Sequence, residues 1–271
     1  MRGAWAEAEE ASWQFYMDIA QGLFHLGRTS EAMLHLSRAL ELAGEFGRRD
    51  PRLARTLNAL GVMHGRVRDC EGAEELLRGA VAISERAYGP KHVQVGTALM
   101  NLGTVYRLQE KFEAAAAEFQ RALAVMESAA GARSMEVALV LDMIGDVSFV
   151  LKQHTAAQFA LHRALEIKEA LLGPEDWSIA VTLGKLGEFY LAGGRYSEAE
   201  PLLRRALSIK RKTVDEADPA SANDVKRLAY VLAAQRKFEE AEPLLADVEA
   251  MLKRALAAGG DEIIHRIDHL S

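Results

Sequence analysis

Apolar residues recur along the chain at helical spacing, in pairs of segments joined by short polar turns. The stretch 97–138 shows the pattern, because its apolar positions fall three or four residues apart on either side of the polar triplet Gln109-Glu110-Lys111. The apolar positions before the turn are Leu99, Leu102, Val105 and Tyr106, and those after it are Phe112, Ala115, Phe119, Ala122 and Val125. The pattern predicts two helices joined as a hairpin.

Small residues repeat along the chain with a period of 42: Gly61, Gly103, Gly145 and Gly187, followed by Ala229. Two further series keep the same spacing: Ala73, Ala115, Ala157, Ala199 and Ala241, and then Ala80, Ala122, Ala164 and Ala206, followed by Val248. A fixed period of this size is typical of stacked helical repeats. Helices that pack about 8–10 Å apart cannot hold bulky side chains at every contact, so we expect these small residues where helices meet.

The period divides the chain into six repeats, of which the first is one residue short. We expect residues 1–12 to extend the first helix and residues 259–271 to form a C-terminal tail or a short capping helix. The array itself is expected over 13–258, as 13–50, 51–91, 92–133, 134–175, 176–217 and 218–258. Gly or Asp precedes Pro in four links (Asp50-Pro51, Gly89-Pro90, Gly173-Pro174 and Asp218-Pro219), which predicts that Gly ends a helix and Pro starts the next.

These positions resemble the tetratricopeptide repeat (TPR), which has a Leu-Gly pair, an aromatic residue three positions later, an Ala twelve after the Gly and another Ala seven after that. Two units match this motif fully: Leu102-Gly103, Tyr106, Ala115 and Ala122, and Leu186-Gly187, Tyr190, Ala199 and Ala206. The long period of 42 resembles the repeats of kinesin light chains. The resemblance implies an all-α fold, a right-handed superhelical solenoid of about six hairpins. It also implies a concave groove, lined by the first helix of each hairpin, that takes a partner protein or an extended peptide.

Composition narrows the classes of function. Lys and Arg total 33 and Asp and Glu total 39, for a formal charge of −6, which does not favour a nucleic-acid-binding protein. The single cysteine, Cys70, excludes an intrachain disulfide and is typical of a reducing compartment. No segment holds 18 uninterrupted apolar residues, so membrane insertion is not expected. We therefore expect a cytoplasmic protein.

Candidate groove residues follow from the positions around each repeat's glycine. They are Arg55, Asn58, Arg66, Met100, Asn101, Thr104, Arg107, Asp142, Asp146, Phe149, Lys185, Glu188, Lys226, Arg227 and Tyr230. The predicted groove is basic at its start, acidic in its middle and basic at its end. Asn58 and Asn101 offer a donor and an acceptor to a peptide backbone. The alternative is that Arg107 pairs with Asp142 or Asp146 and merely neutralises the groove.

The chemistry of an enzyme is not indicated. The sequence has no phosphate-binding GxxxxGK[ST] loop and no recognisable nucleophile–base arrangement, so we expect no catalytic residues. No cofactor is expected either. His265 and His269 lie four residues apart with Asp261 and Asp268 close by, but the segment has no HExxH arrangement, so we expect no metal site. The sequence predicts a scaffold or adaptor that binds a partner in its groove. One alternative is a regulator whose superhelix changes shape with a peptide ligand, and a minor one is an enzyme with an unrecognised site.

Two other features of the sequence lie outside the predicted groove. Cys70 aligns with Phe112 and Tyr196 at the start of a predicted second helix, which favours a buried packing position. Trp5 and Trp13 form either a hydrophobic cap at the N-terminal end of the array or an exposed docking patch.

Overall fold

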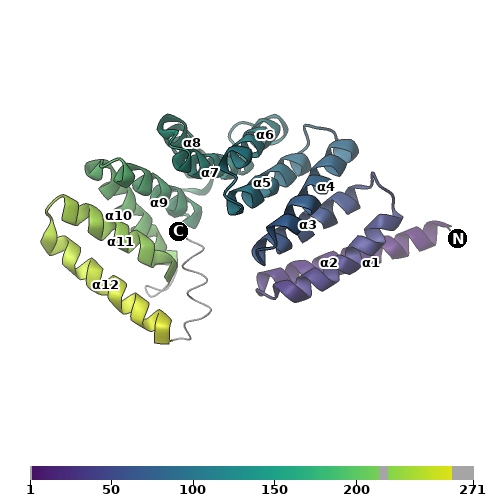
Figure 1. Cartoon of the computed structure of the whole chain (residues 1–271), viewed down its shortest axis with the longest axis horizontal. Coiled ribbons are helices and arrows are strands. Elements are labelled where there is room, and N and C mark those ends of the chain that lie inside the picture. Colours follow the sequence, from purple (N-terminus) through teal and green to yellow (C-terminus); the bar gives the residue numbers. More distant parts are fainter. Residues whose placement is uncertain (1, 214–218, 258–271) are drawn as a thin grey trace. The chain divides into compact units, whose positions relative to one another are not determined.

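The computed structural model describes residues 2–213 and 219–257, and this part of the chain is entirely helical (Figure 1). The predicted tail at 259–271 lies outside the described residues, as does the side chain of Trp5. The twelve helices are α1 (Arg2–His25), α2 (Thr29–Glu45), α3 (Pro51–Arg66), α4 (Cys70–Tyr88), α5 (Val93–Leu108), α6 (Phe112–Ala130), α7 (Met135–Val150), α8 (His154–Leu172), α9 (Trp177–Ala192), α10 (Tyr196–Thr213), α11 (Pro219–Ala234) and α12 (Phe238–Ala257). The predicted all-α fold is confirmed.

The chain forms two compact units, 1–153 and 154–271. The first holds the hairpins α1–α2, α3–α4 and α5–α6, followed by α7. The second begins with α8 and continues with the hairpins α9–α10 and α11–α12. Within each unit consecutive helices pack on one another, and odd-numbered helices also contact the next odd-numbered helix: α3 with α5, α5 with α7, and α9 with α11. The odd-numbered helices of a unit therefore share a layer.

Three of the periodic glycines, Gly61, Gly103 and Gly187, lie where the two helices of their hairpins touch. A Cβ on Gly61 would lie 2.5 Å from Cγ of Leu77, and one on Gly103 would lie 2.7 Å from Cε1 of Phe119. The alanines of the second and third series are buried, as Ala115 and Ala122 show with no exposed surface. The prediction that small residues mark helix contacts is confirmed, because any side chain at these glycines would push the hairpin apart.

Each hairpin turn contains one residue in the left-handed region, and these six residues share one place in the repeat. They are Gly27, Arg68, Glu110, Lys152, Gly194 and Arg236, with φ between 58° and 74°. After each of them, the next backbone N–H bonds to a carbonyl five residues back, as in Lys111 N to Tyr106 O at 2.8 Å. This geometry closes the end of the first helix and reverses the chain within three residues.

The links between hairpins differ partly from the prediction. Pro51 and Pro219 do begin helices. In the links that contain Pro90 and Pro174, however, the next helix begins three residues after the proline, at Val93 and Trp177. His92 and Asp176 cap these helices through side-chain acceptors for the amides two residues on. The start of a helix is set there by the capping side chain, which satisfies an otherwise unpaired amide.

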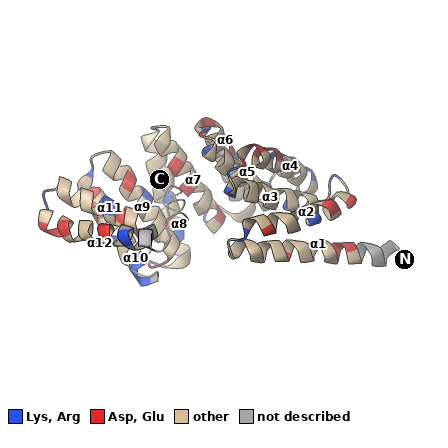
Figure 2. Cartoon of the chain, turned by 60° about the horizontal axis from the view of Figure 1, so that its bottom comes forward, with Lys and Arg blue, Asp and Glu red and all other residues tan. Residues whose placement is uncertain are grey.

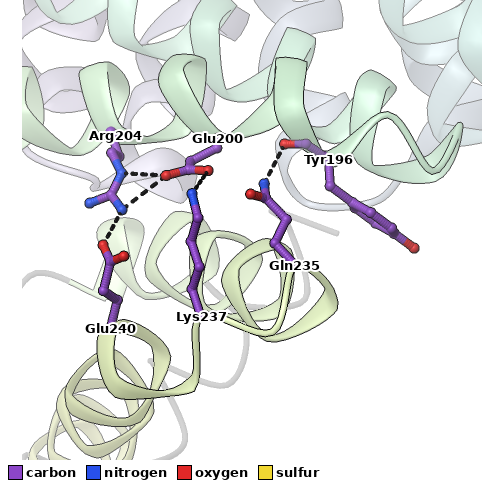
Figure 3. A network of polar contacts seen from close by, with 6 residues as sticks. All are labelled: Tyr196, Glu200, Arg204, Gln235, Lys237 and Glu240. Carbon is purple, nitrogen blue, oxygen red and sulfur yellow. Dashed lines mark hydrogen bonds and ion pairs between the residues drawn. The ribbon is translucent and has the colours of Figure 1, made fainter.

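A polar cluster joins α10 to the following hairpin (Figure 3). The carboxylate of Glu200 accepts hydrogen bonds from Arg204 at 3.0 Å and from Lys237 at 2.7 Å. Arg204 also reaches Glu240 on α12, and Gln235 donates to the backbone carbonyl of Tyr196 at 3.0 Å. We call this group, Tyr196, Glu200, Arg204, Gln235, Lys237 and Glu240, the Glu200 clasp.

The same contacts recur three periods earlier in the first unit. Glu74 pairs with Arg78 at 2.6 Å and with Lys111 at 3.1 Å, while Gln109 donates to the carbonyl of Cys70 at 3.1 Å. Glu74 and Glu200 each lie 37 residues before the lysine they bind, so the contact joins the second helix of one hairpin to the turn of the next. Because each carboxylate is largely covered by its partners, we expect it to contribute to stability.

The Glu200 clasp should make the free energy of unfolding depend on pH. The hydrogen bond from Lys237 lowers the pKa of the Glu200 carboxyl, and Arg204 adds to this effect against the opposing effect of burial. A lowered folded-state pKa stabilises the fold at pH values above the unfolded value of about 4.3, and the contribution is lost as the pH falls below it. Glu200→Gln should therefore destabilise the protein by about 1–2 kcal/mol at pH 7 and by much less near pH 3.5.

Urea unfolding of both proteins at the two pH values measures this difference. Glu113→Gln is the matched control, since Glu113 is exposed on α6. An equal loss of stability at both pH values in Glu200→Gln would contradict a charge-based role.

Candidate functional site

The predicted groove residues of the first unit gather on α3 and α5. We call the surface that bears Arg55, Asn58, Arg66, Met100, Asn101, Thr104 and Arg107 the α3/α5 face. Asn101 on α5 donates a hydrogen bond from Nδ2 to Oδ1 of Asn58 on α3, at 2.9 Å, so the two helices present their amides side by side. Thr104 bonds its own helix, from Oγ1 to the carbonyl of Met100 at 2.9 Å. All four side chains are partly exposed.

Two arginines of this face stack on aromatic rings of α1. The guanidinium carbon of Arg55 lies 4.9 Å from the ring centre of Trp13, and that of Arg66 lies 4.5 Å from the ring centre of Phe24. Trp13 is 2% exposed and donates from Nε1 to Oγ1 of Thr56 at 2.9 Å, so Arg55 rests on a fixed surface. Stacking of this kind holds a guanidinium in place and leaves its charge uncompensated.

The third arginine, Arg107, is partly exposed, and its Nε is buried without a hydrogen-bond partner. Among the described residues, neither Arg55, Arg66 nor Arg107 forms an ion pair. Arg107 therefore forms no ion pair with Asp142 or Asp146, which was the alternative interpretation of the sequence. The face carries three cations that are positioned by aromatic stacking and packing, and whose charges no carboxylate of the described chain offsets.

The acidic residues of α7 are placed differently from each other. Asp142 is 3% exposed, so its carboxylate lies in the interior and cannot meet a ligand at the surface. Asp146 and Phe149 are partly exposed on the same helix. The prediction that Asp142 and Asp146 would together make an acidic stretch of groove therefore holds at most for Asp146, because helical spacing alone does not tell how deeply a neighbouring helix buries each position.

The predicted groove residues of the second unit lie on α9 and α11, and their charges are largely offset. Arg227 binds Glu188 at 2.6 Å and Asp224 at 3.2 Å. Asp224 also forms a buried ion pair with Lys210 of α10. Lys226 is exposed, and Lys185 is partly exposed. Because the carboxylates already have cationic partners, this surface offers a ligand less net charge than the α3/α5 face.

Tyr230 is the main apolar feature on the second unit's odd-numbered helices. It is 59% exposed, and its ring meets that of Tyr196 edge to face, with centres 6.4 Å apart. The exposed Tyr230 and the partly exposed Tyr196 form an amphipathic patch that can pack against an apolar or aromatic side chain of a partner.

The described residues also bear on nucleic-acid binding, metal binding and membrane insertion. Figure 2 shows acidic and basic residues interspersed along the helices of each unit, without a basic stripe. Over 2–213 and 219–257, no three His, Cys, Asp or Glu side chains are placed to hold a metal ion. None of the helices in this part is both long and apolar enough to span a bilayer. Cys70 is half-buried at the start of α4 and not fully buried, which corrects the prediction for this residue.

The aromatic supports of the arginines were not predicted. Trp13 and Phe24 each precede their arginine by one 42-residue period. Because the first repeat is one residue short, each aromatic residue stands one position before the equivalent of its arginine, and that offset is the signal that could have found them. Trp13, predicted to be either a cap or an exposed patch, is a buried packing residue.

The sequence matches the family model of the tetratricopeptide repeat over residues 52–128 and 136–212, which together cover more than half of the chain. The chain therefore belongs to the tetratricopeptide repeat family. Among curated protein sequences, none matches it significantly.

Solved structures agree with this assignment. The fold is similar to that of BtubC (BKLC) from P. vanneervenii, with a TM-score of 0.73 and 22% identity over 85% of this chain and 92% of that one. It is also similar to a putative kinesin light chain from Podosopora anserina, with a TM-score of 0.64 and 21% identity over 76% of this chain and 98% of that one. A third similar structure is YrrB, described as a TPR protein with an unusual peptide-binding site, with a TM-score of 0.51 and 20% identity over 80% of this chain and 91% of that one. The predicted resemblance to kinesin light chain-type arrays is confirmed at the level of the fold.

Proposed function

We propose that the chain is a non-catalytic scaffold or adaptor whose α3/α5 face binds an extended, acidic segment of a partner protein. The observation that carries this proposal is the set of three arginines without an ion-pair partner among the described residues, where ten other arginines form ion pairs. Arg55 and Arg66 are exposed, so an acidic ligand can reach both guanidinium groups and form charge-assisted hydrogen bonds with them. The family assignment and the peptide-binding site of YrrB support a role in protein recognition.

The amide pair gives this face a way to hold a backbone. The hydrogen bond between Asn58 and Asn101 uses one donor and one acceptor, and leaves Nδ2 of Asn58 and Oδ1 of Asn101 for a ligand. These two groups match the C=O and the N–H of a peptide unit. Backbone recognition of this kind is independent of sequence, so the arginines would supply the selectivity.

Helix geometry sets the spacing of the acidic residues. Arg55 and Arg66 are eleven residues apart on α3, which corresponds to about 16 Å along the helix axis. An extended peptide advances at most about 3.3–3.6 Å per residue, so roughly five residues bridge the two guanidinium groups. A segment that lies along α3 would therefore carry two Asp or Glu residues about five positions apart. Charge-assisted hydrogen bonds of about 1.5–3 kcal/mol each, together with the amide contacts, are enough for micromolar affinity.

The test uses labelled 12-residue peptides with two Glu residues five positions apart, and the same peptides with Gln at both positions. We expect the Glu peptides to bind at micromolar concentrations and the Gln peptides at least tenfold more weakly. Arg55→Glu combined with Arg66→Glu should reduce binding of the Glu peptides by at least a hundredfold, because two attractions become repulsions. Fluorescence anisotropy at two salt concentrations measures both effects.

Arg86→Glu is the matched control, because Arg86 is exposed on α4 in the same unit and lies outside the α3/α5 face. It makes the same charge reversal as each of the two substitutions in the double variant, and it should leave the affinity within about twofold of the parent. Equal binding of the Glu and Gln peptides, or equal losses in Arg86→Glu and the double variant, would remove the α3/α5 face from the account.

A further inference from the structure

An exposed aromatic residue on α1 occupies a place that is buried in every later repeat. Phe15 is 59% exposed. The equivalent residues of the later odd-numbered helices are at most 3% exposed: Thr56, Ala98, Val140, Thr182 and Asp224. Thr56 and Asp224, for example, contact the hairpin before their own: Thr56 accepts a hydrogen bond from Trp13 of α1, and Asp224 forms an ion pair with Lys210 of α10. The surface around Phe15 thus has the shape that receives a helix, and no element of the described chain covers it.

Phe15 belongs to a continuous stripe along α1. The members are spaced alternately four and three residues apart, which places them on one side of a helix. They are Ala8, Ser12, Phe15, Ile19, Gly22 and, directly after the helix, Leu26. All are exposed except Ile19, which is partly exposed, and no atom lies within 4 Å of the place where Gly22 would carry a Cβ. A shallow groove of about 750 Å³ runs beside the stripe, between α1 and Arg38, Glu41 and Leu42 of α2.

We propose that this stripe is the contact surface of a two-fold dimer, in which α1 of one copy packs antiparallel on α1 of a second copy. With the axis at the level of Met17, Ala8 faces Leu26 of the other copy, Ser12 faces Gly22, and Phe15 faces Ile19. The bulky side chain of Leu26 thus meets the small side chain of Ala8 of the other copy. Ser12 and Gly22 permit close approach on both sides of the central Phe15 and Ile19 pair, as helix packing requires.

The charged residues beside the stripe also favour a second copy of the chain as the binding partner. A two-fold contact brings a surface onto itself, so its charges must be self-complementary. Arg38 and Glu41 border the groove side by side, 2.8 Å apart and with more than 60% of each side chain exposed. At the end of the stripe the antiparallel pairing also places Glu9 opposite His25 of the other copy. A surface of a single sign would repel its copy, whereas Arg38 and Glu41 give this groove one charge of each sign.

The interface is expected to be small. The stripe spans nineteen residues from Ala8 to Leu26, or about 27 Å of helix. Contacts of this length fall near the lower limit of about 1,000 Å² for specific interfaces, so we expect a dimer that forms at micromolar concentrations.

Sedimentation velocity of the full chain from 1 to 200 µM tests the proposal. The parent should shift from monomer to dimer over this range. Phe15→Glu should raise the dimer dissociation constant at least tenfold, whereas Leu34→Glu should not change it, because Leu34 is equally exposed on α2 but lies off the stripe. Unchanged circular dichroism of Phe15→Glu shows that its fold is intact. A parent that stays monomeric at 200 µM, a dimer that Phe15→Glu leaves unchanged, or growth into longer oligomers would each overturn the two-fold contact.

Disulfide trapping tests the antiparallel arrangement. In a Cys70→Ala background, an oxidised mixture of the Ser12→Cys and Gly22→Cys proteins should form a mixed disulfide dimer at least tenfold faster than either protein alone. Faster cross-linking of Ser12→Cys with itself would indicate parallel helices and would overturn the proposed pairing.

Discussion

Replacing Gly187 with leucine is expected to destabilise the second unit by about 3 kcal/mol, the upper part of the range for overpacking. Even a Cβ at this position would lie 2.6 Å from both Cγ and Cδ2 of Leu203 on α10. Cγ is the branch point of the leucine and cannot swing aside, so α9 and α10 must separate. Urea unfolding followed by the fluorescence of Trp177, which begins α9, measures the loss.

Alanine gives the matched comparison for this prediction. Gly187→Ala adds one methyl group into the same contact and should cost about 1–3 kcal/mol. Gly79→Ala adds the same methyl in the middle of α4, where it would meet Cδ1 of Leu57 at an ordinary 3.4 Å. Because alanine favours the helix over glycine, this change should stabilise the protein by about 0.5–1 kcal/mol. Equal effects of the two substitutions would contradict the assignment of the glycine series to helix contacts.

The same close contacts explain why the fold could be predicted. A glycine at the crossing of two helices is required by backbone geometry, whatever the other side chains do, and its recurrence every 42 residues marks each hairpin. Helix starts were harder to predict, since Val93 and Trp177 follow capping side chains and not the prolines nearby. Two local signals are present in these links, the proline and the capping side chain, and the helix begins after the capping side chain.

The candidate site was predictable only in part. The position of Arg55 relative to Gly61 gives the side of the helix, but its support on Trp13 depends on how one hairpin stacks on the previous one. The burial of Asp142 and the pairing of Arg227 with Glu188 depend on neighbouring helices in the same way. Comparison at equivalent repeat positions recovers some of these contacts, because the partner lies one period away. Side-chain conformation decides the rest.

The second unit contains a buried ion pair at two positions that hold apolar residues elsewhere in the array. Lys210 and Asp224 form an ion pair with 9% and 4% of their side chains exposed. Lys210 also lies 5.2 Å from the ring centre of Trp177, and Asp224 receives a second bond from Arg227. Two periods earlier the same two places hold Met126 and Val140, both buried and apolar. The repeat thus accommodates either a salt bridge or an apolar contact at one structural position.

We expect Asp224→Val to destabilise the protein by about 3–5 kcal/mol, because it removes the carboxylate that compensates the buried ammonium of Lys210. Lys210→Met should cost less, since Asp224 keeps Arg227 as a partner. The double variant reproduces the Met126 and Val140 pair, and should recover most of the loss, since a buried ion pair replaced by well-packed apolar residues is often nearly neutral. A double-mutant cycle from urea unfolding of the four proteins should therefore give a coupling energy of about 2 kcal/mol or more. Additive losses in the double variant would mean that Lys210 and Asp224 act independently, and that the apolar pair of the first unit depends on surroundings which the second unit lacks.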